Sequence, residues 1–82
     1  MEKFPGLREG QVALRRAELS TGIILDENYV YAVRDDQKVY SVFNDIDTAL
    51  KIAQQIIAER NNIECVVCGQ NGIVIEYLSS NK

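Results

Sequence analysis

The sequence predicts an α+β fold in which one helix packs on an antiparallel sheet. Apolar residues recur at three- and four-residue steps between residues 46 and 60, as in an amphipathic helix. β-branched and aromatic runs flank that segment on both sides, as strands prefer. Short polar clusters separate the runs, which is typical of hairpins. The 82 residues are enough for a single domain, 1–82.

Residues 1–22 are predicted to form an N-terminal helical segment. Positions 8–19 are rich in good helix formers, Pro5-Gly6 precedes them, and Gly22 suits a stop after them. The apolar residues 23–25 that follow are interpreted as a short strand or an extended arm. Asp26-Glu27-Asn28 is then a turn-forming cluster.

Residues 29–78 are predicted to form a ββαββ core. Its strands are expected at 29–34, 38–43, 63–68 and 73–78, with turns at 35–37 and 69–72. Asn44 or Asp45 can cap the helix, and Asp47 suits the positive end of its dipole. Asn61-Asn62 can supply a left-handed cap, and Asn71-Gly72 favours positive φ angles. The tail, 79–82, is expected to fray.

Both faces of the predicted sheet carry apolar side chains. Strand side chains alternate between faces, and a half-polar outer face would alternate more cleanly than these runs do. One helix can cover only one face. We therefore expect the N-terminal helix, a second copy of the chain or another protein to cover part of the second face, although scattered exposed apolar residues are also normal.

These patterns favour a non-catalytic protein-interaction module that self-associates through the second sheet face. The expected partner is a second copy of the chain, as a homodimer, or another protein in a small assembly. Aromatic side chains commonly anchor such interfaces. The contact residues predicted from the strands and from the N-terminal helix are Tyr29, Tyr31, Tyr40, Tyr77, Leu14 and Leu19.

The alternative hypothesis is a nucleic-acid-associated regulatory protein that uses the basic cluster Arg8, Arg15 and Arg16. Nucleic-acid binders neutralise phosphates with Lys and Arg and are usually basic. The chain has a net charge of −3 and a pI of about 4.8, which disfavours this alternative. A small-ligand-binding domain ranks third and an enzyme fourth.

No residue set indicates catalysis, a metal or a cofactor. Cys65 and Cys68 form a C-x-x-C, but their odd spacing in a predicted strand places the two sulfurs on opposite faces. The sequence contains no histidine, the commonest general acid–base group, and no glycine-rich phosphate loop. The acidic residues are explained by helix capping and turns. We therefore expect no enzyme activity, no cofactor and two cysteines that act as small buried hydrophobes.

No apolar run approaches the ~18–20 residues of a membrane-spanning helix. The first six residues lack the apolar stretch of a secretory signal, and two cysteines are too few for a secreted disulfide scaffold. A cytoplasmic location without membrane contact is the expectation.

At several positions the sequence resembles those of small bacterial proteins of uncharacterised function. The resemblance rests on Thr48-Ala49, Ala53 and the run from Val66 to Ile73, with its Gly-x-x-Gly-Ile turn. It covers residues 29–78 and implies a ββαββ fold. It brings over no catalytic residue, and Cys68 departs from the more polar residue expected there.

Overall fold

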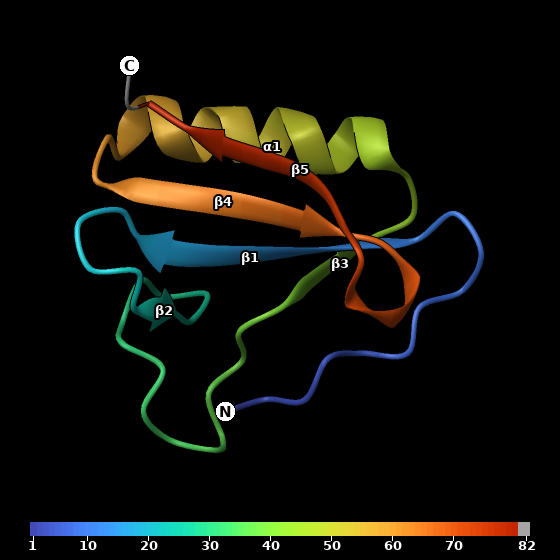
Figure 1. The fold of residues 1–82 in the computed structure, drawn as a ribbon, viewed down its shortest axis with the longest axis horizontal. Coiled ribbons are helices and arrows are strands. Elements are labelled where there is room, and N and C mark those ends of the chain that lie inside the picture. The colour runs from blue at the N-terminus through green and yellow to red at the C-terminus, as the bar shows by residue number, and fades with distance from the viewer. Residues whose placement is uncertain (81–82) are drawn as a thin grey trace.

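The computed structural model describes residues 1–80, in which one helix packs on a five-stranded antiparallel sheet (Figure 1). The elements in chain order are β1 (Val12–Glu18), β2 (Ile24–Leu25), β3 (Ser41–Phe43), α1 (Ile46–Glu59), β4 (Ile63–Cys68), the 3₁₀ turn η1 (Gln70–Gly72) and β5 (Val74–Ser79). The predicted α+β class is confirmed. The predicted element order is wrong, because the helix follows three strands.

The segment predicted as an N-terminal helix is the central strand β1. This strand pairs with β4 along one edge and with both β2 and β3 along the other. Val12 and Leu14 enter the core under α1, while Ala13 enters a second core on the opposite face. Burial on both faces favours extended pairing over the helix propensity of the Ala, Leu, Arg and Glu residues in this segment.

The predicted hairpin of residues 29–43 does not form. Residues 29–34 lie in a loop whose one bridge among the described residues joins Leu25 to Tyr31, and β3 retains only Ser41–Phe43 and pairs with β1. The Asp26 carboxylate accepts hydrogen bonds from the amides of Asn28 and Val30, at 2.8 and 3.0 Å. Such local side-chain bonds compete with a strand ladder because they bind its donors.

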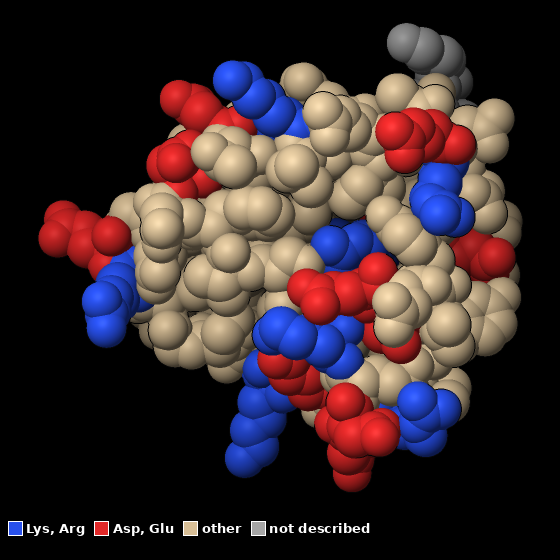
Figure 2. Space-filling view, turned by 180° about the vertical axis from the view of Figure 1, so that it is seen from behind, with Lys and Arg blue, Asp and Glu red and all other residues tan. Residues whose placement is uncertain are grey.

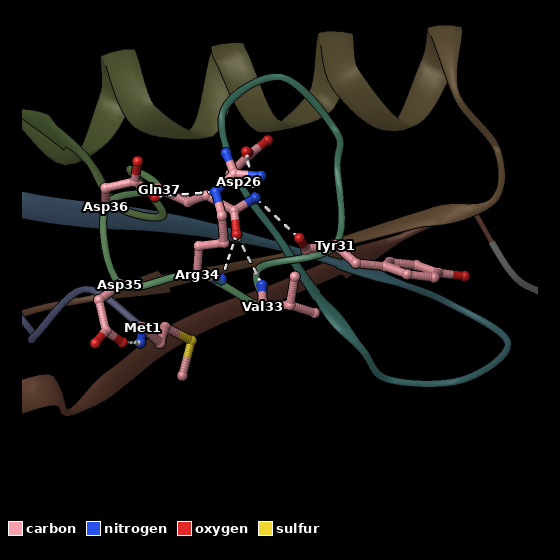
Figure 3. Close-up of polar contacts among 8 residues, drawn as sticks. All are labelled: Met1, Asp26, Tyr31, Val33, Arg34, Asp35, Asp36 and Gln37. Atoms are coloured by element: carbon pink, nitrogen blue, oxygen red, sulfur yellow. Dashed lines mark hydrogen bonds and ion pairs between the residues drawn. The ribbon is translucent and has the colours of Figure 1, made fainter.

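A buried Gln37 closes this loop from the other end (Figure 3). Its amide nitrogen donates to Asp26 Oδ2 (2.8 Å) and to the Tyr31 carbonyl (2.9 Å), and its amide oxygen accepts from the Val33 and Arg34 backbones. The side chains of Asp26 and Gln37 thus bind backbone groups of the loop that would otherwise pair with a neighbouring strand. The loop is therefore built on side-chain hydrogen bonds.

The helix agrees with the sequence pattern. Asp45 caps it by accepting a 2.8 Å hydrogen bond from the Thr48 amide, and Asp47 lies in the first turn. Its buried face consists of Ala49, Ala53 and Ile56. The expected left-handed cap at 61–62 is wrong: Arg60 is the C-cap, with φ −134°, and neither asparagine has a positive φ.

The C-terminal hairpin also follows the prediction closely. β4 spans the predicted residues, and Asn71 and Gly72 take φ values of 64° and 77° in the turn. β5 begins one residue later than expected and includes Ser79, and a register shift at the Val67–Cys68 step marks a bulge. Ser79 and Ser80, predicted to fray, are held by pairing with β4 and by a hydrogen bond to the Asn61 carbonyl. The last two residues of the predicted tail lie outside the described residues.

Candidate functional site

Half of the sheet face away from α1, the second face, is covered by the chain itself. Ala13, Val39 and Tyr40 form a small core there, and the Phe4 ring packs edge-on against Tyr40 at 5.1 Å between ring centroids. The Glu2 carboxylate fixes this cover by accepting the Val39 and Tyr40 amides at 2.7 and 3.0 Å. The N-terminal segment therefore covers this half, but as an extended chain and not as a helix.

The edge of the sheet formed by β5 is open, whereas its neighbour β4 is buried. β5 is the edge strand, since the sheet order is β2-β1-β4-β5. Its first four residues are exposed, and the residue before it is exposed as well. The large apolar side chains along this edge are Ile73, Val74, Ile75 and Tyr77, of which Tyr77 is 53% exposed. Long apolar edge strands are templates for pairing with another chain.

The pairing of β4 defines which backbone groups face β5. The Leu19 amide donates to the Asn62 carbonyl at 2.8 Å, so Asn62 and every second residue after it turn their backbone groups towards β1. The residues between them, including Cys65 and Val67, must turn theirs towards β5.

Tyr77 and Ser79 therefore present backbone groups at the outer edge. Leu78 and Glu76 lie opposite the β4 residues that face β5, so their amides and carbonyls join that ladder. Tyr77 and Ser79 alternate with them and point the other way, and no other strand pairs there among residues 1–80. β5 thus combines free backbone donors and acceptors with apolar side chains.

The Tyr77 side chain is fixed across the sheet surface. Its hydroxyl donates a 2.6 Å hydrogen bond to Glu64, and this bond to a carboxylate raises the pKa of Tyr77. Tyr77 also lies opposite Val66, which is buried although no described helix covers this face. A ring held in this way presents apolar surface with little rotamer entropy left to lose on contact.

The predicted contact residues do not form one surface. Leu14 is completely buried beneath α1, and Tyr40 is buried beneath Phe4, so neither is available to a partner. Leu19 is half-buried at the end of β1. Tyr29 and Tyr31 line a separate hollow, and Tyr77 alone lies on the exposed edge strand. The prediction assumed a helix and a hairpin that the fold does not contain.

The predicted basic cluster is dispersed. Arg15 and Arg16 point to opposite faces because they are neighbours in β1, and Arg16 is only 6% exposed. Arg8 lies in the exposed segment before the strand. Figure 2 shows acidic and basic side chains side by side on the face it displays, with no continuous basic area there. The residues proposed for nucleic-acid contact do not make a surface together.

The two cysteines lie on opposite sides of the sheet, as their spacing predicts. Cys65 belongs to the core under α1, whereas Cys68 is opposite Ala13 of the second-face core. Both are buried and free, and burial raises both pKa values, that of Cys65 to about 11. Among residues 1–80 no group of three or more His, Cys, Asp or Glu is arranged to hold a metal.

Comparison with protein-family models, with curated proteins and with solved structures finds no match to this chain. Within the described residues, no helix is both long and apolar enough to cross a membrane. The β5 edge was not foreseen from the sequence. The available signal was the apolar Ile73-Val74-Ile75 run, which would favour pairing with another chain if exposed at a sheet edge.

Proposed function

We propose that the chain is a non-catalytic interaction module that self-associates through the outer edge of β5. The observation that carries this proposal is the outward-facing backbone of Tyr77 on an unpaired, apolar edge strand. Adding a strand to such an edge satisfies backbone donors and acceptors and buries alternate side chains. The mode of association differs from the one predicted from the sequence, because the strand edge contributes more than the sheet face.

A second copy is the partner that best fits this edge. In a two-fold symmetric antiparallel pair, the same surface of each chain meets, and only residues whose backbone groups point outward can form hydrogen-bonded pairs. A register centred on Tyr77 meets this requirement at its centre, where Tyr77 opposes Tyr77 of the partner subunit. Ser79 then opposes Ile75 of the partner subunit, the residue at the bulge between Val74 and Glu76.

Neighbouring registers are less favourable. A pair centred on Glu76 places two carboxylates directly opposite each other, which destabilises a sheet. Centring on Tyr77 instead places Glu76 opposite Leu78 of the partner subunit and brings two aromatic rings together. Aromatic cross-strand pairs are among the more stabilising ones, at roughly 0.2–1 kcal/mol each. Charge and aromatic pairing thus select the same register.

The test is sedimentation velocity of the full chain over a wide concentration range. The wild type should shift from monomer to dimer, and Tyr77→Lys should remain monomeric because an edge lysine blocks strand addition. The matched control is Val33→Lys, since Val33 is 78% exposed but lies in the loop before Gln37. A wild type that stays monomeric, or a Tyr77→Lys variant that dimerises as well as Val33→Lys, would contradict the proposal.

A further inference from the structure

A hollow of about 330 Å³ opens at the opposite edge of the sheet from β5. It lies where β1 ends, β4 begins and α1 has just ended, and the loop after β2 forms its remaining wall. Its lining residues are Glu18, Leu25, Tyr29, Tyr31, Arg60, Asn62 and Ile63. Small-molecule sites start at roughly 300 Å³, so the volume suits a small ligand.

Two opposite charges line this hollow without pairing to each other. The Glu18 carboxylate accepts from the hydroxyls of Thr21 and Tyr31, at 2.7 and 2.8 Å, and among residues 1–80 it forms no ion pair. The Arg60 guanidinium likewise has no carboxylate partner in the described part of the chain. Both hydroxyls donate to the same oxygen of Glu18, so its other oxygen remains available as an acceptor.

The guanidinium is held in position by an aromatic ring. Arg60 lies over Tyr29, 3.9 Å from the ring centroid, and this cation–π contact leaves the edge of the guanidinium free to donate. Tyr29 itself has a φ of 64°, a backbone conformation that bulky side chains rarely adopt. Its amide donates to the Asp26 carbonyl at 3.0 Å, within the loop closed by Gln37. The Tyr29 backbone is therefore strained in the conformation that places its ring beside Arg60.

The floor of the hollow is apolar. Leu25 and Ile63 are both buried and belong to the core beneath α1. The lining thus holds one anion and one cation, neither in an ion pair among residues 1–80, around an apolar floor. A simple anion would gain from Arg60 but be repelled by Glu18, and a simple cation would have the reverse problem.

We infer that this hollow binds a small zwitterion, an amino acid with an aliphatic side chain. Its carboxylate would accept hydrogen bonds from Arg60, its ammonium would donate to Glu18, and its side chain would lie on Leu25 and Ile63. Both charges would then form charge-assisted hydrogen bonds, which are stronger than neutral ones. The inference goes beyond self-association, since no residue of β5 lines the hollow.

The test is an amide-resolved NMR titration of the full chain with three probes that share the same branched aliphatic chain. L-leucine carries both charges, 3-methylbutylamine lacks the carboxylate, and 4-methylpentanoate lacks the ammonium. L-leucine should shift the Tyr29, Tyr31 and Asn62 amides in a saturable way, and each half-charged probe should bind at least tenfold more weakly. Equal binding of either half-charged probe, or no saturable shift with L-leucine, would overturn the inference.

Point variants distinguish loss of binding at the hollow from loss of binding through unfolding. Arg60→Gln should weaken L-leucine binding at least tenfold, whereas Glu59→Gln, an exposed neighbour that does not line the hollow, should leave it unchanged. Glu18→Gln should weaken L-leucine but not 4-methylpentanoate. Full binding by Arg60→Gln with an intact spectrum would also contradict the assignment.

Discussion

Arg16 Nη2 donates a 2.7 Å hydrogen bond to the Ser41 hydroxyl, joining the central strand to the start of β3. The Ser41 hydroxyl in turn donates to Glu27 at 2.6 Å, and Arg16 Nη1 donates to the Val39 carbonyl at 3.4 Å. Arg16 Nε is buried with no partner among the described residues. A residue predicted to make surface contacts is therefore an incompletely paired core cation.

Replacing Arg16 tests whether its charge or its volume stabilises the fold. Buried ionic groups with imperfect partners can often be replaced by apolar residues of similar size at no cost. Arg16→Met should therefore have a free energy of unfolding equal to or above that of the wild type. Arg16→Ala should lose about 2–4 kcal/mol, because it leaves a cavity. Urea denaturation measures both, and equal losses would show that the guanidinium bonds dominate.

Asp26 should make the free energy of unfolding depend on pH in the acidic range. Hydrogen bonds from the Gln37 side chain and then from the Val30 amide lower the pKa of Asp26 below its ordinary value of 3.8. The folded state thus favours the carboxylate, so its stabilisation is present above pH 3.8 and is lost as pH falls through the lowered pKa.

The variant Asp26→Asn should have a lower Tm at neutral pH, by roughly 5 °C. The difference from the wild type should shrink as the pH is lowered from 4 towards 2. Scanning calorimetry across this range makes the comparison, since the other carboxylates are common to both proteins. A difference that stays constant with pH would rule out the charged form as the source of the stabilisation.

Cys65 should be almost inert in the folded chain. Burial raises its pKa from the ordinary 9.0 to about 11, and a shift of that size lowers the thiolate fraction about 100-fold near neutral pH. In a Cys68→Ala background, a thiol reagent at pH 8 should react with the folded protein at least ~100-fold more slowly than with the urea-unfolded protein. Comparable rates would place Cys65 outside the core.

The raised pKa of Cys65 should also make the stability of the fold depend on pH in alkali. The folded state retains the thiol proton that the unfolded state loses, so stability should fall as the pH rises from 9 to about 11.

The elements that the sequence predicted best are those formed by local signals. α1 has both a capping aspartate and an apolar stripe, and the turn between β4 and β5 contains Asn71 and Gly72, residues that readily adopt positive φ angles. β1 could not be read in the same way. Its residues, Val-Ala-Leu-Arg-Arg-Ala-Glu, favour a helix locally and form a strand only because three other strands pair with it.

The candidate sites depended on the same long-range contacts. The sequence singled out the tyrosines as contact residues. Tyr29 and Tyr31 lie apart from Tyr77 because residues 29–34 do not form a strand. That failure arises from Asp26 and Gln37, eleven residues apart, whose side chains meet at 2.8 Å. Glu18 and Arg60 meet at one hollow because Ile63 opposes Glu18 in the sheet. Neither relationship has a signature at short sequence distance.

The register of the proposed dimer is the most direct test of its mechanism. Tyr77→Cys would place two thiols in a hydrogen-bonded antiparallel pair, where Cα atoms lie about 5.5 Å apart, within the range of a disulfide. Glu76→Cys is the matched control, because its side chain would face Leu78 of the partner subunit and not its own copy. The native cysteines can remain because both are buried.

Under mild oxidation, non-reducing electrophoresis should show a covalent Tyr77→Cys dimer forming at least tenfold faster than a Glu76→Cys dimer. Equal rates for the two variants, or no covalent dimer from Tyr77→Cys at a concentration where the wild type sediments as a dimer, would contradict pairing through β5 centred on Tyr77.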